Sequence, residues 1–158
     1  MTDWRAVPVF GIAPEGTSAT IRPSAYAVLR NDHAQFAVVR TPEGTYLPGG
    51  GMDAGETPVD TVIRETLEEC GLAIRIGSWT TAAVQFAWSE AERTFFEKRC
   101  TFVDAVVIGR DVSRLEPDHE VLWIDAETAR GMLTHECHAW AGGEGVRRRL
   151  AELSLAFG

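Results

Sequence analysis

The stretch "GGGMDAGETPVDTVIRETLEECGL" covers residues 49–72 and places six carboxylates after a run of three glycines. The letters TPVD at 57–60 predict the start of a helix, because threonine caps helices and proline suits the first helical position. Aspartate also stabilises the positive end of the helix dipole. Gly71 can take the left-handed conformation that commonly ends a helix. The pattern therefore predicts one helix over residues 58–70.

The faces of this helix follow from a rotation of about 100° per residue. The predicted buried face consists of Val59, Val62, Ile63, Thr66, Leu67 and Cys70. Glu65, Glu68 and Glu69 are predicted on the opposite side, where their spacings of three and four residues make them neighbours. Like charges at these spacings cost roughly 0.2–0.5 kcal/mol per pair, so a cation is expected to offset the repulsion.

Arg64 can neutralise one of these carboxylates but not all three. A hard divalent cation can bridge several, and carboxylate ligands favour magnesium, manganese or calcium over zinc. The glycines of 49–51 predict a turn whose backbone can come close to the acids, because glycine has no Cβ. The alternative is a solvated acidic helix face, since runs of exposed glutamates are common.

The complete stretch resembles the Nudix box, written G-x5-E-x7-R-E-U-x-E-E-x-G-U with U a bulky apolar residue. All seven fixed positions are filled, by Gly50, Glu56, Arg64, Glu65, Glu68, Glu69 and Gly71. Thr66 occupies a U position and is the one departure. The resemblance implies an α/β/α sandwich with a mixed β-sheet, of α+β or α/β class, and we expect a single domain over residues 1–158.

The resemblance also implies a reaction, namely hydrolysis of a nucleoside diphosphate linked to another moiety X by attack of water on phosphorus. Mg²⁺ is the implied cofactor, with Mn²⁺ as an alternative. Its implied ligands are Glu65, Glu68, Glu69 and the carbonyl of Gly49. Arg64 is implied to orient Glu65 through an ion pair, and Glu56 to support the junction of loop and helix. A Nudix domain that binds a nucleotide derivative as a sensor, without turnover, is the alternative function.

A general base outside the box is expected in a loop before a late strand. Glu120 is the preferred candidate in "LEPDHEVLWI", and Glu116, Glu97 and Glu65 remain alternatives. Arg40 follows a predicted strand and is a candidate phosphate ligand, although an exposed arginine at a strand end explains it equally well.

Features beyond the box narrow the substrate by elimination. The segment after the box has no proline before Pro117, unlike the ADP-ribose type, and no tyrosine follows Tyr46, unlike the diadenosine-polyphosphate type. The broad MutT-like group remains, with nucleoside triphosphates or oxidised nucleotides as candidate substrates. Four aromatic residues form either a base-stacking surface or part of the core: Phe86, Trp88, Phe95 and Phe96. The letters HECH at 135–138 lack a zinc-protease spacing.

The whole chain sets the remaining expectations. A net charge of −8 over 158 residues argues against nucleic acid as a partner. The absence of a long apolar run or a basic leader, together with three cysteines at no short spacing, predicts a cytoplasmic protein with free thiols. A homodimer is possible. The predicted strands are 24–30, 34–40, 72–88, 99–108 and 120–124, with a hairpin joining the first two. A C-terminal helical region is predicted from Asp125, interrupted by the glycines at 142, 143 and 145.

Overall fold

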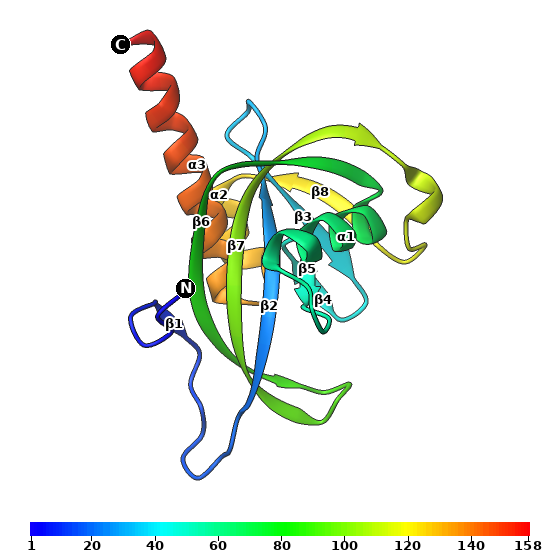
Figure 1. Ribbon diagram of the computed structural model, residues 1–158, viewed down its shortest axis with the longest axis vertical. Helices are drawn as coiled ribbons and strands as arrows, with labels where there is room; N and C mark the ends of the chain where they lie inside the picture. The colour runs from blue at the N-terminus through cyan, green and yellow to red at the C-terminus, as the bar shows by residue number, and fades with distance from the viewer.

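Two β-sheets lie between helices in the computed structural model, which describes residues 1–158 apart from the side chain of Arg114 (Figure 1). In chain order the elements are β1 (Val9–Phe10), β2 (Thr20–Leu29), β3 (Phe36–Thr41), β4 (Gly44–Tyr46), β5 (Gly49–Gly51), α1 (Pro58–Cys70), β6 (Leu72–Ser89), β7 (Thr94–Arg110), η1 (Val112–Arg114), β8 (Glu120–Ile124), α2 (Ala126–Met132) and α3 (Glu136–Phe157). The expected sandwich of helices around a mixed sheet is confirmed.

The larger sheet has five strands in the order β1-β6-β7-β2-β5 and the smaller has three in the order β4-β3-β8. β2 pairs in parallel with β7 over its whole length and antiparallel with β5 over Ser24–Tyr26. The predicted hairpin between the strands at 24–30 and 34–40 is therefore present only at its turn, where the N–H of Asn31 donates to the carbonyl of Gln35 over 3.0 Å. β3 turns into the smaller sheet, and a single bridge between Arg30 and Phe36 joins the two strands.

β2 and β3 bury both of their faces over their apolar parts, Ser24–Leu29 and Phe36–Val39. Alternate residues of β2 point to opposite sides: Tyr26 and Val28 pack towards α2 and α3, whereas Ala25, Ala27 and Leu29 pack towards α1. β3 alternates in the same way. The two cores hold the helices at fixed positions on opposite sides of the strands, and α1 thereby lies against β2 and β5.

α1 begins and ends at the predicted residues. Thr57 accepts the backbone N–H of Asp60, whose carboxylate accepts the N–H of Thr57, and Gly71 has a φ of 61°. The predicted buried face is only partly correct, because Val59 and Ile63 are exposed. The buried residues are Thr61, Val62, Thr66 and Cys70.

The helix is therefore rotated about its axis relative to the expectation. Glu65 and Glu69 lie one turn apart along the edge of the buried face, and both are half-buried. The prediction that the acids lie on the side opposite the buried face is therefore wrong for Glu65 and Glu69. Contacts of α1 with β2 and β5 carry the two carboxylates towards the glycine strand.

α3 runs through the three glycines that were expected to interrupt it, so that prediction is also wrong. A Cβ on Gly142 would lie 2.3 Å from the ring of Phe36, and one on Gly145 would lie 2.6 Å from Val28. Packing against these side chains outweighs the low helix propensity of glycine, which is about 1 kcal/mol per residue. The glycines let α3 come close to the strands.

The last turns of α3 extend beyond the sheets in Figure 1, and Leu155 and Phe157 are exposed there. Within the described part of the chain, no helix is long and apolar enough to cross a membrane.

Candidate active site

Arg64 is the centre of an ion-pair network on α1. Its Nε and Nη2 atoms donate to the two carboxylate oxygens of Glu56, each over 2.8 Å, and Nη1 donates to Glu65 over 3.0 Å. Glu56 also accepts the N–H of Asp53 and the hydroxyl of Thr61. These hydrogen bonds, chiefly those from Arg64, lower the pKa of Glu56 to about 2. The network fixes the loop before α1 to the helix and holds the Glu65 carboxylate in one orientation.

The glycine run is a strand, not the predicted turn. β5 pairs antiparallel with β2, and a Cβ on Gly49 would lie 2.2 Å from the carbonyl oxygen of Ala25. The N–H of Gly49 donates to Glu69 over 2.8 Å. A Cβ on Gly50 would lie 3.0 Å from the Glu65 carboxylate. The sequence predicts that this backbone comes close to the acids. In the structure it comes close both to β2, with which it pairs, and to the carboxylates of Glu65 and Glu69.

Burial and mutual repulsion change the acidity of these carboxyl groups. Burial, and to a smaller extent the charges of Glu65 and Glu116, raise the pKa of Glu69 to about 8, although the N–H of Gly49 opposes the shift. Burial also raises the pKa of Glu65, although Arg64 opposes that shift. Half-buried carboxylates that repel one another form a donor set suited to a hard divalent cation. The residues present therefore fit the expected metal.

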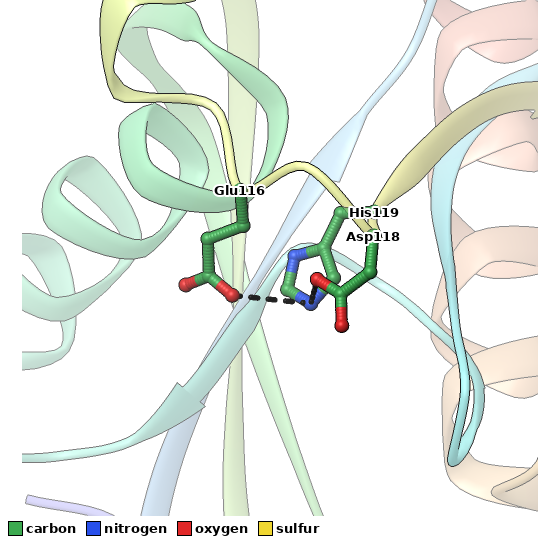
Figure 2. A group of neighbouring side chains, drawn as sticks. All are labelled: Glu116, Asp118 and His119. Carbon is green, nitrogen blue, oxygen red and sulfur yellow. Dashed lines mark ion pairs between the residues drawn. The ribbon is translucent and has the colours of Figure 1, made fainter.

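Glu116 lies beside this cluster, in the loop between η1 and β8. Its backbone N–H donates to the carbonyl of Glu68 over 3.2 Å, which ties the loop to α1. Figure 2 shows the side chains of Glu116, Asp118 and His119 pointing towards one another. The imidazole Nε2 lies 3.3 Å from Glu116 and 3.9 Å from Asp118, and the three could hold a metal ion together. Sequence reasoning missed Asp118 and His119, because neighbouring letters in a loop have no diagnostic spacing.

A cleft of about 570 Å³ adjoins the acids. Glu69 and the glycine strand form one part of its wall, so the acid cluster opens into a space large enough for a small-molecule ligand. The cleft is lined by Arg22, Ser24, Tyr26, Glu43, Tyr46, Gly49, Gly50, Gly51, Glu69, Trp88, Ser89, Glu90, Ala91, Glu92, Lys98, Thr134 and His135.

Comparison with protein families matches residues 20–141 to the NUDIX domain, which is more than half of the chain. The chain belongs to the Nudix family. Family membership supports a hydrolase that acts on pyrophosphate bonds. Comparison with curated protein sequences gives no significant match.

Solved Nudix structures share the fold at low sequence identity. A NUDIX hydrolase from Nitrosomonas europaea superposes with a TM-score of 0.63 at 19% identity, covering 77% of this chain and 86% of that one. A MutT protein from Methanosarcina mazei gives 0.59 at 24% identity, covering 85% and 98%. A UDP-X diphosphatase gives 0.52 at 16% identity, covering 85% and 63%. These likenesses establish the fold and leave the substrate open.

The other candidate residues of this Nudix domain lie away from the acid cluster of α1 or on its margin. Arg40 forms an exposed ion pair with Glu120 over 3.3 Å across paired strands. Glu97 pairs with Arg99 on β7 over 2.7 Å. The structure thus brings Glu116 to the α1 acids, whereas the carboxylates of Glu97 and Glu120 each have an arginine partner.

The aromatic residues divide between core and cleft. Phe96 is buried, and Phe86 stacks on Phe95 with 6.3 Å between the ring centroids. Trp88 is 52% exposed and lines the cleft, as does Tyr46. Sequence reasoning assigned no ligand role to Lys98 or His135, which line the same cleft. No motif marks them, since they meet only when β7 and the segment before α3 come together.

Proposed function

We propose that this Nudix protein is a metal-dependent pyrophosphohydrolase that cleaves a nucleoside diphosphate linked to another moiety, with nucleoside triphosphates or oxidised nucleotides as the first candidates. One observation carries the proposal: Glu69 belongs both to the acid cluster of α1 and to the wall of the cleft. A phosphate chain bound in the cleft would therefore lie against the metal-binding acids. The buried free cysteines suit the cytoplasmic location expected from the sequence.

Mg²⁺ would be held by Glu65, Glu68, Glu69 and the carbonyl of Gly49, with Mn²⁺ as an alternative. The bound cation supplies neutralisation of phosphate oxygens and a more acidic water. Arg64 keeps the Glu65 carboxylate oriented through the contact of 3.0 Å, and its pairing with Glu56 limits the freedom of the guanidinium. Gly49 positions Glu69 through its N–H.

Glu116 is the general base that the geometry favours. Its charge acts on both Glu65 and Glu69, and its backbone is bonded to α1. A general base must reach the water that it deprotonates, so proximity to the metal acids is the first requirement. Glu120, the preferred candidate from the sequence, has its carboxylate 3.3 Å from Arg40. We therefore assign proton removal to Glu116.

The proposal is tested by measuring product release from nucleoside triphosphates, oxidised nucleotides, dinucleoside polyphosphates, ADP-ribose and sugar nucleotides, with and without Mg²⁺. Wild type is compared with Glu69→Gln and with Glu97→Gln, a matched control whose carboxylate pairs with Arg99 outside the acid cluster. Metal-dependent cleavage that only the first substitution abolishes supports the hydrolase. Tight binding of one compound without cleavage would support the sensor instead.

A further inference from the structure

Lys98 is the only lysine in the chain, since the other fourteen of its fifteen Lys and Arg residues are arginines. It lies on β7, is half-buried and lines the cleft. Its ammonium nitrogen lies 3.1 Å from Nε2 of His135. Within the described part of the chain it forms no ion pair. A cation that faces a cleft without a carboxylate partner has donors left for a ligand.

His135 is held so that it can accept from this ammonium. Its side chain is buried, and the rings of Tyr46 and His138 each lie 5.3 Å from it. Burial, and then the charge of Lys98, lower the pKa of His135 to about 4, so the imidazole is neutral at pH 7. A neutral imidazole can accept one hydrogen bond from Lys98, and an ammonium group has three donors. Two donors thus remain for the cleft.

The strand register separates Lys98 from the metal acids. Lys98 lies opposite Arg22 on β2, and Ser24 on β2 lies opposite Gly51 on β5. Two strand spacings, about 10 Å, therefore lie between the glycine strand and β7. A nucleotide whose phosphates lie at the metal acids would extend its base, beyond the ribose, in this direction. Arg22 itself is already paired with Glu92.

Aromatic side chains on the same cleft suit a base. Trp88 presents an exposed indole whose N–H donates to Glu90 over 2.6 Å, which fixes the ring. Tyr46 lines the cleft beside His135. Stacking a base on such rings is favourable for every base, so it cannot select among them. Selection needs a polar group, and Lys98 is the half-buried cation available there.

We infer that Lys98, positioned by His135, donates to a carbonyl oxygen on the base and selects keto bases over amino bases. The inference rests on the proposed function, whose site it extends to the substrate class. An ammonium only donates, so it favours a carbonyl oxygen and repels the N–H groups of an amino substituent at the same position. One hydrogen bond to a charged group corresponds to a preference of about 10- to 100-fold in kcat/KM.

Two matched pairs of nucleotides test the inference: inosine triphosphate against ATP, and UTP against CTP. Each pair replaces a carbonyl by an amino group on one edge of the base. Wild type is expected to prefer the keto member of at least one pair by about 10- to 100-fold. Lys98→Met should remove the preference by slowing only the keto member. Arg99→Met is the control, because Arg99 pairs with Glu97 and lies over the ring of Trp4. An equal loss for both members of a pair would overturn the inference and indicate a phosphate contact.

A second measurement does not depend on turnover or on the folding of a variant. Because Lys98 is the only lysine, reductive methylation of the wild-type protein reports on one side-chain amine, separable from the N-terminus by peptide mass. With Ca²⁺ in place of Mg²⁺, the keto member of at least one of the two pairs should slow methylation of Lys98 by at least about tenfold more than its amino counterpart does. Equal protection within both pairs, or no protection, would overturn the inference. If wild type cleaved no compound and this selective protection still occurred, the proposed hydrolysis would fail while the base contact stood.

Discussion

Arg64 donates two hydrogen bonds to the Glu56 carboxylate, each 2.8 Å long, and its remaining terminal nitrogen donates to Glu65. This one guanidinium links the loop before α1 to a carboxylate expected to bind metal. The planar fork of arginine matches the carboxylate, and lysine cannot reproduce it. The relationship explains why the two acids need an arginine between them.

Arg64→Lys is therefore expected to reduce kcat by about 100-fold, because a small misplacement of Glu65 disturbs the reacting geometry. The Tm should fall as well, since Glu56 loses one of its two bonds. Steady-state kinetics and thermal denaturation measure the two effects. Arg40→Lys is the control, because its ion pair with Glu120 is exposed. Equal activity in Arg64→Lys and wild type would contradict the positioning role.

Glu116→Gln is expected to lower kcat by about 10²–10⁴-fold, the usual contribution of a general base. KM should change little, because glutamine keeps the size of the side chain. Rates at saturating substrate for Glu116→Gln and Glu120→Gln compare the two candidates directly. A large loss in Glu120→Gln with full activity in Glu116→Gln would return the assignment to Glu120.

The contribution of Glu69 to the stability of the metal-free protein is expected to fall as the pH rises from about 4.5 to about 8. The folded chain holds this proton with a pKa of about 8, against 4.5 for an ordinary glutamate. The unfavourable effect of ionisation is therefore absent below pH 4.5 and complete above pH 8. Histidines that stay neutral when folded, such as His135, act in the opposite direction.

The difference between wild type and Glu69→Gln isolates this contribution. Thermal denaturation in EDTA should show Glu69→Gln gaining stability relative to wild type as the pH rises through this range. Added Mg²⁺ should reduce the gap, because a bound cation favours the ionised carboxylate. A gap that does not change with pH would show that Glu69 ionises normally in the folded protein.

Gly142→Ala is expected to destabilise the fold by about 1–3 kcal/mol, as overpacking usually does. The added methyl group would clash with the Phe36 ring, because the Cβ would lie only 2.3 Å from it. Gly143→Ala is a matched control in the same helix, since its Cβ would lie 3.9 Å from Ala126. It should stabilise the helix by up to about 1 kcal/mol. Urea denaturation compares the two, and equal effects would contradict the packing account of α3.

Local signals in the sequence predicted α1 well, because the cap at Thr57 and the left-handed Gly71 act within a few residues. The buried face of the same helix was predicted less well. Hydrophobicity placed Val59 and Ile63 inside, whereas contacts with β2 and β5 turn Glu65 and Glu69 towards the cleft. A functional site can hold half-buried acids that periodicity assigns to solvent.

Long-range neighbours could not be predicted from one sequence. Glu116 reaches α1 only because its loop bonds to the end of the helix, and Lys98 meets His135 across 37 residues. The sequence predicts a turn at residues 49–51, whereas they form β5. Three glycines do not indicate a strand by themselves, and pairing with β2 makes them one. The Nudix box identifies the acids of α1 as candidate metal ligands, but the fold determines which other side chains lie beside them.

Isothermal calorimetry with Mn²⁺ tests the central claim most directly, because it measures metal binding without a substrate. Wild type and Glu97→Gln are predicted to bind the ion with equal affinity. Glu69→Gln is predicted to bind it more than about tenfold more weakly, since it removes a charged ligand. Equal binding by Glu69→Gln and wild type would contradict the claim that the acids of α1 form the metal site.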